Sequence, residues 1–218
     1  MIVLLVALTF AVAILIDAIL IERLAAKKAR GLAEGADSAQ RPGPMKQARD
    51  FLFHEGHTWM KVVKAEVAVG LDDFTQRFVG AIDRIEVPRP GDVVTKGKPM
   101  WTVRFGDRSF TQPAPVSGRV LEVNEALVKD PSLTNRSPYA EGWIVKIRPE
   151  SLSREMPELS SPSRFAKWTD LQKAKFFGSA FGDLGAVYGD GEELIPGVAR
   201  QIDPETWDQL SRKFFGAA

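Results

Sequence analysis

The chain has 218 residues, enough for one ordinary domain with extensions or for two small domains. Basic and acidic side chains nearly balance, 29 against 28, so composition gives no sign of a nucleic-acid-binding protein. Cysteine is absent and the only histidines are His54 and His57, which excludes disulfides and thiolate chemistry and disfavours a metal or haem site built on several histidines. We expect no metal and no cofactor.

The first apolar segment, residues 2–21, is long enough to cross a membrane. It is interrupted only by Thr9 and Asp17, and about 20 helical residues cover about 30 Å, the thickness of the hydrocarbon core. No basic residue precedes the segment and no small-residue cleavage site closes it before the next charges, which disfavours a signal peptide. The pattern predicts a transmembrane helix over residues 1–24, with a signal peptide or a hydrophobic partner helix as alternatives.

Flanking charge predicts the orientation of this helix. Basic residues follow the segment and none precedes it, which places the amino terminus outside and the rest of the chain in the cytoplasm of a bacterial-type inner membrane. Asp17 lies one turn from the charged end, where its carboxylate reaches interfacial water or bonds to a neighbouring membrane helix. The basic residues are Arg23, Lys27, Lys28 and Arg30.

The pattern changes twice after the membrane segment. Residues 25–50 begin with good helix formers and then contain Pro42 and Pro44, which indicates a juxtamembrane helix and a linker. Residues 51–150 consist of short β-rich runs with glycines between them, which is typical of a small sandwich or barrel.

Motifs in this second region resemble the H protein of the glycine cleavage system. Two are shared outright, A-P-V-S-G at residues 114–118 and V-N-E-A-L at residues 123–127. The stretch P-S-L-T-N-R-S-P-Y-A-E-G-W, residues 131–143, is close to a motif that characterises H proteins rather than lipoyl domains in general. Weaker matches are His57-Thr58-Trp59, residues 69–76 with Gly80, and the turn at residues 86–92.

The resemblance implies a mainly β fold, the lipoyl-type barrel-sandwich hybrid, here with an N-terminal transmembrane helix and C-terminal helices added. In the family, a lysine at the tip of one hairpin carries lipoate. Counting back from Ala114 without a gap places Asp107 at that position, in the tip Phe105-Gly106-Asp107-Arg108. An aspartate has no amine to form the lipoyl amide, so we expect the carrier function to be lost.

Charged residues near this tip are candidates for binding a partner. Arg104 stands where the family has a glutamate, and Arg108 follows the tip. Both could contact another protein, or form surface ion pairs, which is the simpler interpretation. The carboxylates Asp72 and Asp73 could suggest acid–base chemistry, but their place before a short helix favours an N-cap. The spacing of His54 and His57 does not match a helical zinc motif.

Residues 151–218 extend beyond the H-protein pattern. A helix is predicted to start near Pro162, with Phe165, Trp168 and Phe176 at roughly helical intervals. This helix could pack on the barrel, dock on a protein partner, or lie on the anionic membrane surface. A last helix is predicted after Asp203 and should pack on the barrel.

The sequence therefore predicts a membrane-anchored, non-catalytic accessory subunit. In this hypothesis, a lipoyl-less H-protein-like domain stabilises a multi-subunit membrane complex, respiratory or photosynthetic. Its partners would be integral membrane subunits and the lipid bilayer, without nucleic acid or a small-molecule substrate. The alternative is a membrane-tethered lipoyl carrier modified at another lysine. An enzyme is disfavoured because we find no nucleophile–base pair, metal set or cofactor loop.

Overall fold

The computed structural model describes residues 50–181, 189–190, 193–194 and 196–216. The predicted transmembrane helix over residues 1–24, Asp17 within it and the juxtamembrane region up to residue 49 lie outside the described residues. Among the helices that are described, none combines the length and the apolar character needed to span a bilayer.

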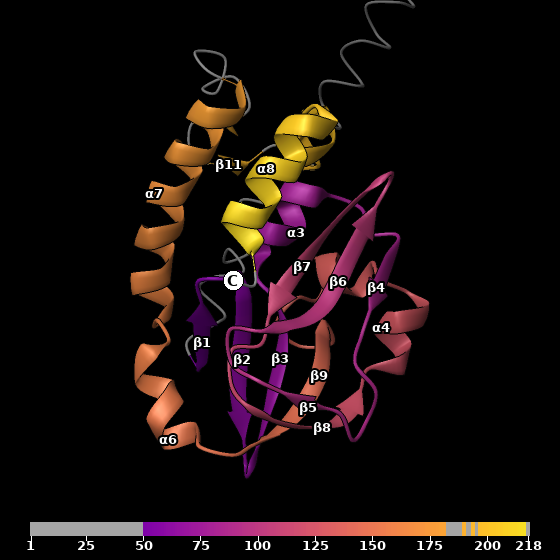
Figure 1. The fold of residues 1–218 in the computed structure, drawn as a ribbon, viewed down its shortest axis with the longest axis vertical. Coiled ribbons are helices and arrows are strands. Elements are labelled where there is room, and N and C mark those ends of the chain that lie inside the picture. Colours follow the sequence, from indigo (N-terminus) through magenta and orange to yellow (C-terminus); the bar gives the residue numbers. More distant parts are fainter. Residues whose placement is uncertain (1–49, 182–188, 191–192, 195, 217–218) are drawn as a thin grey trace, which may run out of the picture. The chain divides into compact units, whose positions relative to one another are not determined.

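The described part of the chain is built mainly from antiparallel strands, as predicted (Figure 1). Two sheets contribute to one hydrophobic core, because buried residues of both belong to a single cluster. The larger sheet has the order β1-β2-β3-β9-β8-β5 and the smaller has the order β4-β6-β7. The strands are β1 (Phe51–His54), β2 (Thr58–Val63), β3 (Glu66–Leu71), β4 (Arg84–Glu86), β5 (Val93–Val94), β6 (Pro99–Phe105), β7 (Arg108–Pro113), β8 (Gly118–Val123), β9 (Trp143–Pro149) and a small hairpin of β10 (Gly189–Asp190) and β11 (Glu193–Leu194).

Helices connect the strands and form most of the C-terminal extension. Asp72 caps the first of them by accepting the Thr75 N–H at 2.7 Å, which confirms the N-cap interpretation. The extension helix begins at Pro162, as predicted, and Asp203 caps the last helix. The helices are α3 (Asp73–Val79), α4 (Glu125–Lys129), α5 (Leu133–Arg136), α6 (Leu152–Glu155), η1 (Met156–Glu158), α7 (Pro162–Phe181), η3 (Val198–Gln201) and α8 (Pro204–Phe215).

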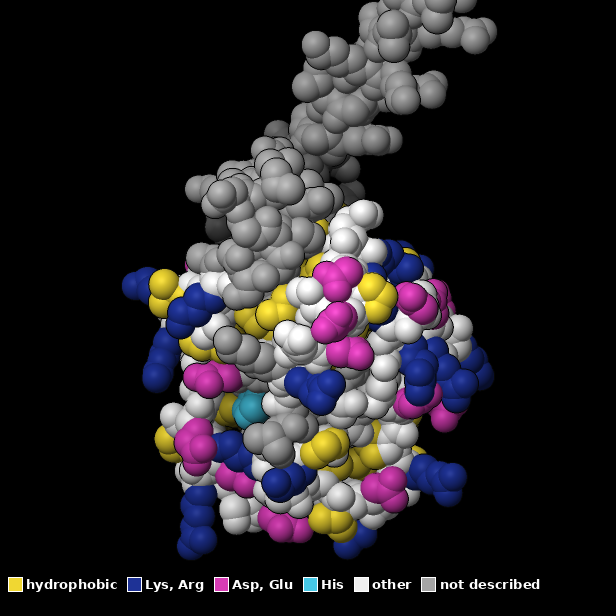
Figure 2. All heavy atoms as spheres, turned by 45° about the horizontal axis from the view of Figure 1, so that its top comes forward, with side chains coloured by type: hydrophobic (Ala, Val, Ile, Leu, Met, Phe, Trp, Pro, Cys, Tyr) yellow, Lys and Arg dark blue, Asp and Glu magenta, His cyan; other side chains and the backbone are white. Residues whose placement is uncertain are grey.

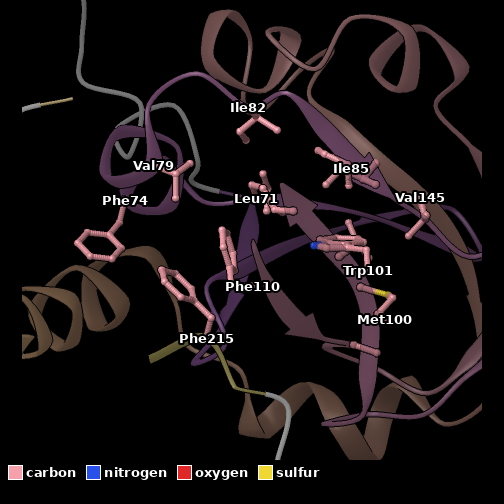
Figure 3. Packing of buried hydrophobic residues seen from close by; sticks show 14 of the residues in the cluster. Leu71, Phe74, Val79, Ile82, Ile85, Met100, Trp101, Phe110, Val145 and Phe215 are labelled. Atoms are coloured by element: carbon pink, nitrogen blue, oxygen red, sulfur yellow. The ribbon is translucent and has the colours of Figure 1, made fainter. Parts of the chain in front are cut away.

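The main core lies between the sheets and includes the end of the chain. In β3, Val67, Val69 and Leu71 are fully buried, the alternation that a strand with one core-facing side requires. From the extension, Trp207 and Phe215 enter the same cluster, and the rings of Phe110 and Phe215 meet with centroids 4.2 Å apart (Figure 3). The larger members of the cluster labelled in Figure 3 also include Phe74, Ile85, Met100 and Trp101.

A smaller cluster lies beneath α7, which runs beside β1 (Figure 1). Phe165 of α7 is fully buried and stacks on Phe53 of β1 with ring centroids 4.6 Å apart. Trp168 packs on the edge of the same cluster, whereas Leu171 is 65% exposed. Of the three interpretations of this helix, these contacts favour packing on the barrel for residues 165–168. Phe176 lies in α7, but its side chain is outside the described residues.

One close backbone approach fastens the extension to α3. Gly80 ends α3 with φ +72°, and a Cβ on it would lie 2.8 Å from the Cα of Gly197. The Gly197 N–H donates to the Arg77 carbonyl at 2.7 Å. Glycine is therefore required at residue 80 both by its positive φ and by the contact, and the contact fixes where η3 begins.

Candidate functional site

The hairpin β6–β7 has the two-residue turn that the sequence predicts. Phe105 pairs with Arg108, and Gly106 and Asp107 form the turn between them. Gly106 has φ +60°, which a glycine adopts without strain. The Asp107 side chain is 83% exposed, and no lysine occurs anywhere in β6, the turn or β7. The tip is therefore a short, exposed turn with a carboxylate where the resemblance expects an amine.

The side chain of Arg108 folds back onto the C-terminal extension. Its guanidinium donates to the carbonyls of Ala199 and Ile202, at the end of η3, and lies 6.0 Å from the ring centre of Trp207. Only 11% of this side chain is exposed. The Ala199 carbonyl also accepts the Ile202 N–H at 3.4 Å. Arg108 therefore adds a charged donor to both carbonyls at this helix end, where backbone acceptors are incompletely satisfied.

The edge of the smaller sheet is covered by α8 (Figure 1). The Trp207 indole N–H donates to the Ser109 carbonyl of β7 at 3.2 Å. The Trp207 ring lies edge-on to Phe105, with centroids 5.2 Å apart. These contacts protect an edge strand that would otherwise present unpaired backbone groups.

Arg104 has a different environment from Arg108. It forms an ion pair with Glu86 across β4 and β6 at 2.6 Å, and the two side chains are 51% and 40% exposed. This bond lowers the pKa of the Glu86 carboxyl. The Arg104 side chain is therefore about half exposed to solvent, whereas the Arg108 side chain is largely buried against the C-terminal extension. The prediction that they bind a partner stays a prediction for both.

A buried His57–Asp72 pair was not foreseen from the sequence. His57 Nδ1 lies 2.7 Å from Asp72 Oδ2, and both side chains are fully buried. His57 has φ +61°, which is uncommon for a residue other than glycine. Its Nε2 has no hydrogen-bond partner among the described residues. Aromatic rings of three helices surround the imidazole: Phe74, Phe165, Trp168, Phe214 and Phe215.

A second, partly buried acid, Asp73, lies next to this pair. The Tyr139 hydroxyl donates to Asp73 Oδ1 at 2.9 Å. Burial, with the neighbouring Asp72 charge, raises the pKa of the Asp73 carboxyl. Burial also raises the pKa of the Tyr139 hydroxyl. The arrangement holds the β2–β3 region, α3 and the 131–143 motif together, and its residues are not convergent on an open cleft.

A cavity beside His54 is open to solvent. It has a volume of about 320 Å³, and its lining includes His54, Gly56, Trp168 and Gln172. His54 Nδ1 accepts the Gly56 N–H at 2.9 Å, and burial lowers the pKa of His54 to about 4. His54 and His57 therefore have separate roles in the fold. Within the described ranges, no three or more His, Asp or Glu side chains are placed to hold a metal ion.

Charges on the outer surface are mixed. Figure 2 shows Lys and Arg side chains interspersed with Asp and Glu over one face, without a broad area of a single sign. Such a face gives no electrostatic signature of nucleic acid.

Comparisons with known proteins agree with the motifs. The family model "Glycine cleavage H-protein" matches residues 51–171. The "Probable glycine cleavage system H protein" of Thermococcus gammatolerans is 36% identical over 129 residues, 59% of this chain and 96% of the relative. The H protein of Carboxydothermus hydrogenoformans is 36% identical over 119 residues, 55% of this chain and 91% of the relative.

A solved structure gives the same assignment for the fold. The crystal structure of an H protein from Mycobacterium marinum matches with a TM-score of 0.52 and 25% identity, over 56% of this chain and 98% of the other. Its match confirms the H-protein-like fold inferred from the motifs. The chain belongs to the glycine cleavage H-protein family.

Proposed function

We propose that this chain is a non-catalytic member of the H-protein family that carries no lipoyl arm and serves as an accessory structural subunit. The observation that carries the proposal is Asp107 in the two-residue turn at the hairpin tip. A lipoyl arm is joined through an amide, which needs a primary amine, and β6 and β7 contain none. Arg108 further supports it, because its side chain is committed to the C-terminal extension.

The setting of the subunit is the second part of the proposal. The apolar segment at residues 2–21 and the basic residues after it support a single-pass anchor in a bacterial-type inner membrane, with the folded domain in the cytoplasm. An anchored domain without a cofactor can stabilise neighbouring integral membrane subunits, and a bioenergetic complex is the host that we propose. The candidates for contacts within that complex remain Asp17, Arg104, Arg108, Phe165, Trp168 and Phe176.

The alternative is a membrane-tethered lipoyl carrier that is modified at another lysine, a role that the resemblance to H proteins implies. Such a carrier would need another lysine, and the nearest are Lys96 and Lys98. Lys96 Nζ is bonded to Glu158 at 2.6 Å and its side chain is only 17% exposed. Lys98 precedes β6, so neither lysine lies at the tip of the hairpin. Both observations favour the arm-less function.

The test is gentle detergent extraction of the tagged chain from native membranes, followed by mass spectrometry of the chain and of everything that co-purifies. Stoichiometric integral membrane subunits with an unmodified chain are expected. A chain that is recovered from the soluble fraction, alone or with soluble glycine-cleavage proteins, would contradict the accessory role.

A further inference from the structure

We infer that residues 197–215 cover the β7 edge and the base of the tip of the β6–β7 hairpin, so that a small molecule can reach the tip but a modifying enzyme cannot. The inference rests on the proposed function, in which the tip has no acceptor lysine. It adds that a second barrier exists, so that restoring a lysine would not restore modification by an enzyme.

The first step is that the β7 side of the hairpin is occupied. Arg108 is bonded to two carbonyls of the extension, and the Trp207 indole is bonded to Ser109. Phe110 is buried against Phe215. An enzyme that approached along β7 would meet α8 instead of the strand.

The second step is that the β6 side is also occupied. In the smaller sheet, β6 lies between β4 and β7, so neither of its edges is free. The Arg200 guanidinium lies 5.6 Å from the centre of the Phe105 ring and donates to the Ala81 carbonyl at 2.7 Å. Asp83 accepts the Gly106 N–H. At the tip, Gly106 and Asp107 are exposed, and on the outer face of β6 the side chain of Arg104 is 51% exposed.

The third step is that this cover is not a loosely attached lid. Val198, Ile202, Trp207 and Phe215 are each at most 2% exposed and belong to the main core. Releasing them would return apolar core surface to water, which is costly in proportion to the area exposed. A protein partner needs roughly 20–30 residues on each side of a stable interface. The exposed turn, even with Arg104 and the partly buried outer side chains of Thr102, Ser109 and Thr111, falls short of that.

The test compares two acylations of an Asp107→Lys variant of the full chain. With N-hydroxysuccinimidyl acetate, the introduced amine attacks the ester carbonyl, an amide forms, and N-hydroxysuccinimide and a proton leave. With a lipoate–protein ligase, lipoate and ATP, the same amine attacks the lipoyl-adenylate carbonyl, the amide forms, and AMP and a proton leave. Peptide mass spectrometry measures both rates.

We expect the small reagent to modify the introduced lysine at the rate of other exposed lysines, and the ligase to act at least thirtyfold more slowly than on an H protein that keeps its own lysine. A ligase rate within thirtyfold of that H protein would overturn the inference, as would an introduced lysine that the small reagent cannot reach.

The matched control separates the cover from the local sequence. The tip Arg-Phe-Gly-Lys-Arg is placed in the hairpin of a lysine-bearing H protein, because the family pattern ends before the region that corresponds to residues 197–215. We expect this chimera to be modified, and a chimera that the ligase ignores would overturn the inference, because local sequence would then suffice. The unchanged chain in the same assay tests the proposed function separately, since its modification would contradict the arm-less function without bearing on the cover.

Discussion

Replacing Arg108 with alanine removes the contact that ties the hairpin to the end of η3. The guanidinium is 11% exposed and donates to the Ala199 and Ile202 carbonyls. A hydrogen bond to a charged group contributes about 1.5–3 kcal/mol, and a buried carbonyl left without a partner is costly. Water can reach part of the vacated space, so we expect Arg108→Ala to lower the free energy of unfolding by about 2–4 kcal/mol.

The assay is urea unfolding of the full-length chain followed by tryptophan fluorescence, because Trp207 lies against Arg108. The matched control is Arg104→Ala, on the same hairpin. Its ion pair with Glu86 is about half exposed, and exposed pairs contribute about 0–1 kcal/mol. If Arg108→Ala costs under about 0.5 kcal/mol, or no more than Arg104→Ala, the contact does not fasten the hairpin and the reasoning fails.

Three further predictions concern Asp73, His54 and the packing of α7. Burial raises the pKa of Asp73, so its ionisation destabilises the native state as pH rises above the ordinary pKa of a carboxyl. Asp73→Asn still accepts the Tyr139 hydroxyl and should raise the melting temperature at pH 7 with no effect near pH 3. Thermal melts that show a lower melting temperature at pH 7 would refute this. Burial lowers the pKa of His54 to about 4, so the native state disfavours its protonated form. As pH drops from about 6.5 to 4, the free energy of unfolding should fall by about 2–3 kcal/mol more in the wild type than in His54→Asn. Urea titration at each pH measures this, and the same pH dependence in both proteins would contradict it. Phe165→Ala should lower the free energy of unfolding by about 3–5 kcal/mol and Leu171→Ala by about 0, because the Phe165 side chain is fully buried and the Leu171 side chain is 65% exposed. If chemical denaturation gives the same loss for both variants, α7 does not pack as described.

Much of the fold could be predicted because its signals are local. Shared motifs such as residues 131–143 identify the family, the Gly106-Asp107 pair marks a two-residue turn, and Asp72 precedes a short helix at cap spacing. Each of these signals lies within a few consecutive residues, so it can be recognised without knowing which distant residues come into contact.

The contacts that distinguish this chain are long-range and could not be predicted in the same way. Arg108 meets Ile202, 94 residues later, through backbone carbonyls that carry no side-chain signature. His57 and Asp72 are 15 residues apart and are joined because β2 and β3 pair. The sequence marks Arg108 as a candidate for binding a partner, but it gives no sign that this side chain also contacts the chain's own extension.

The measurement that tests the central claim most directly is the intact mass of the chain purified from its own cells. If the hairpin carries Asp107 and no arm, the mass should equal that of the unmodified sequence under conditions in which the cell's lipoyl proteins are fully loaded. A species heavier by one lipoyl group, on any lysine, would contradict the account.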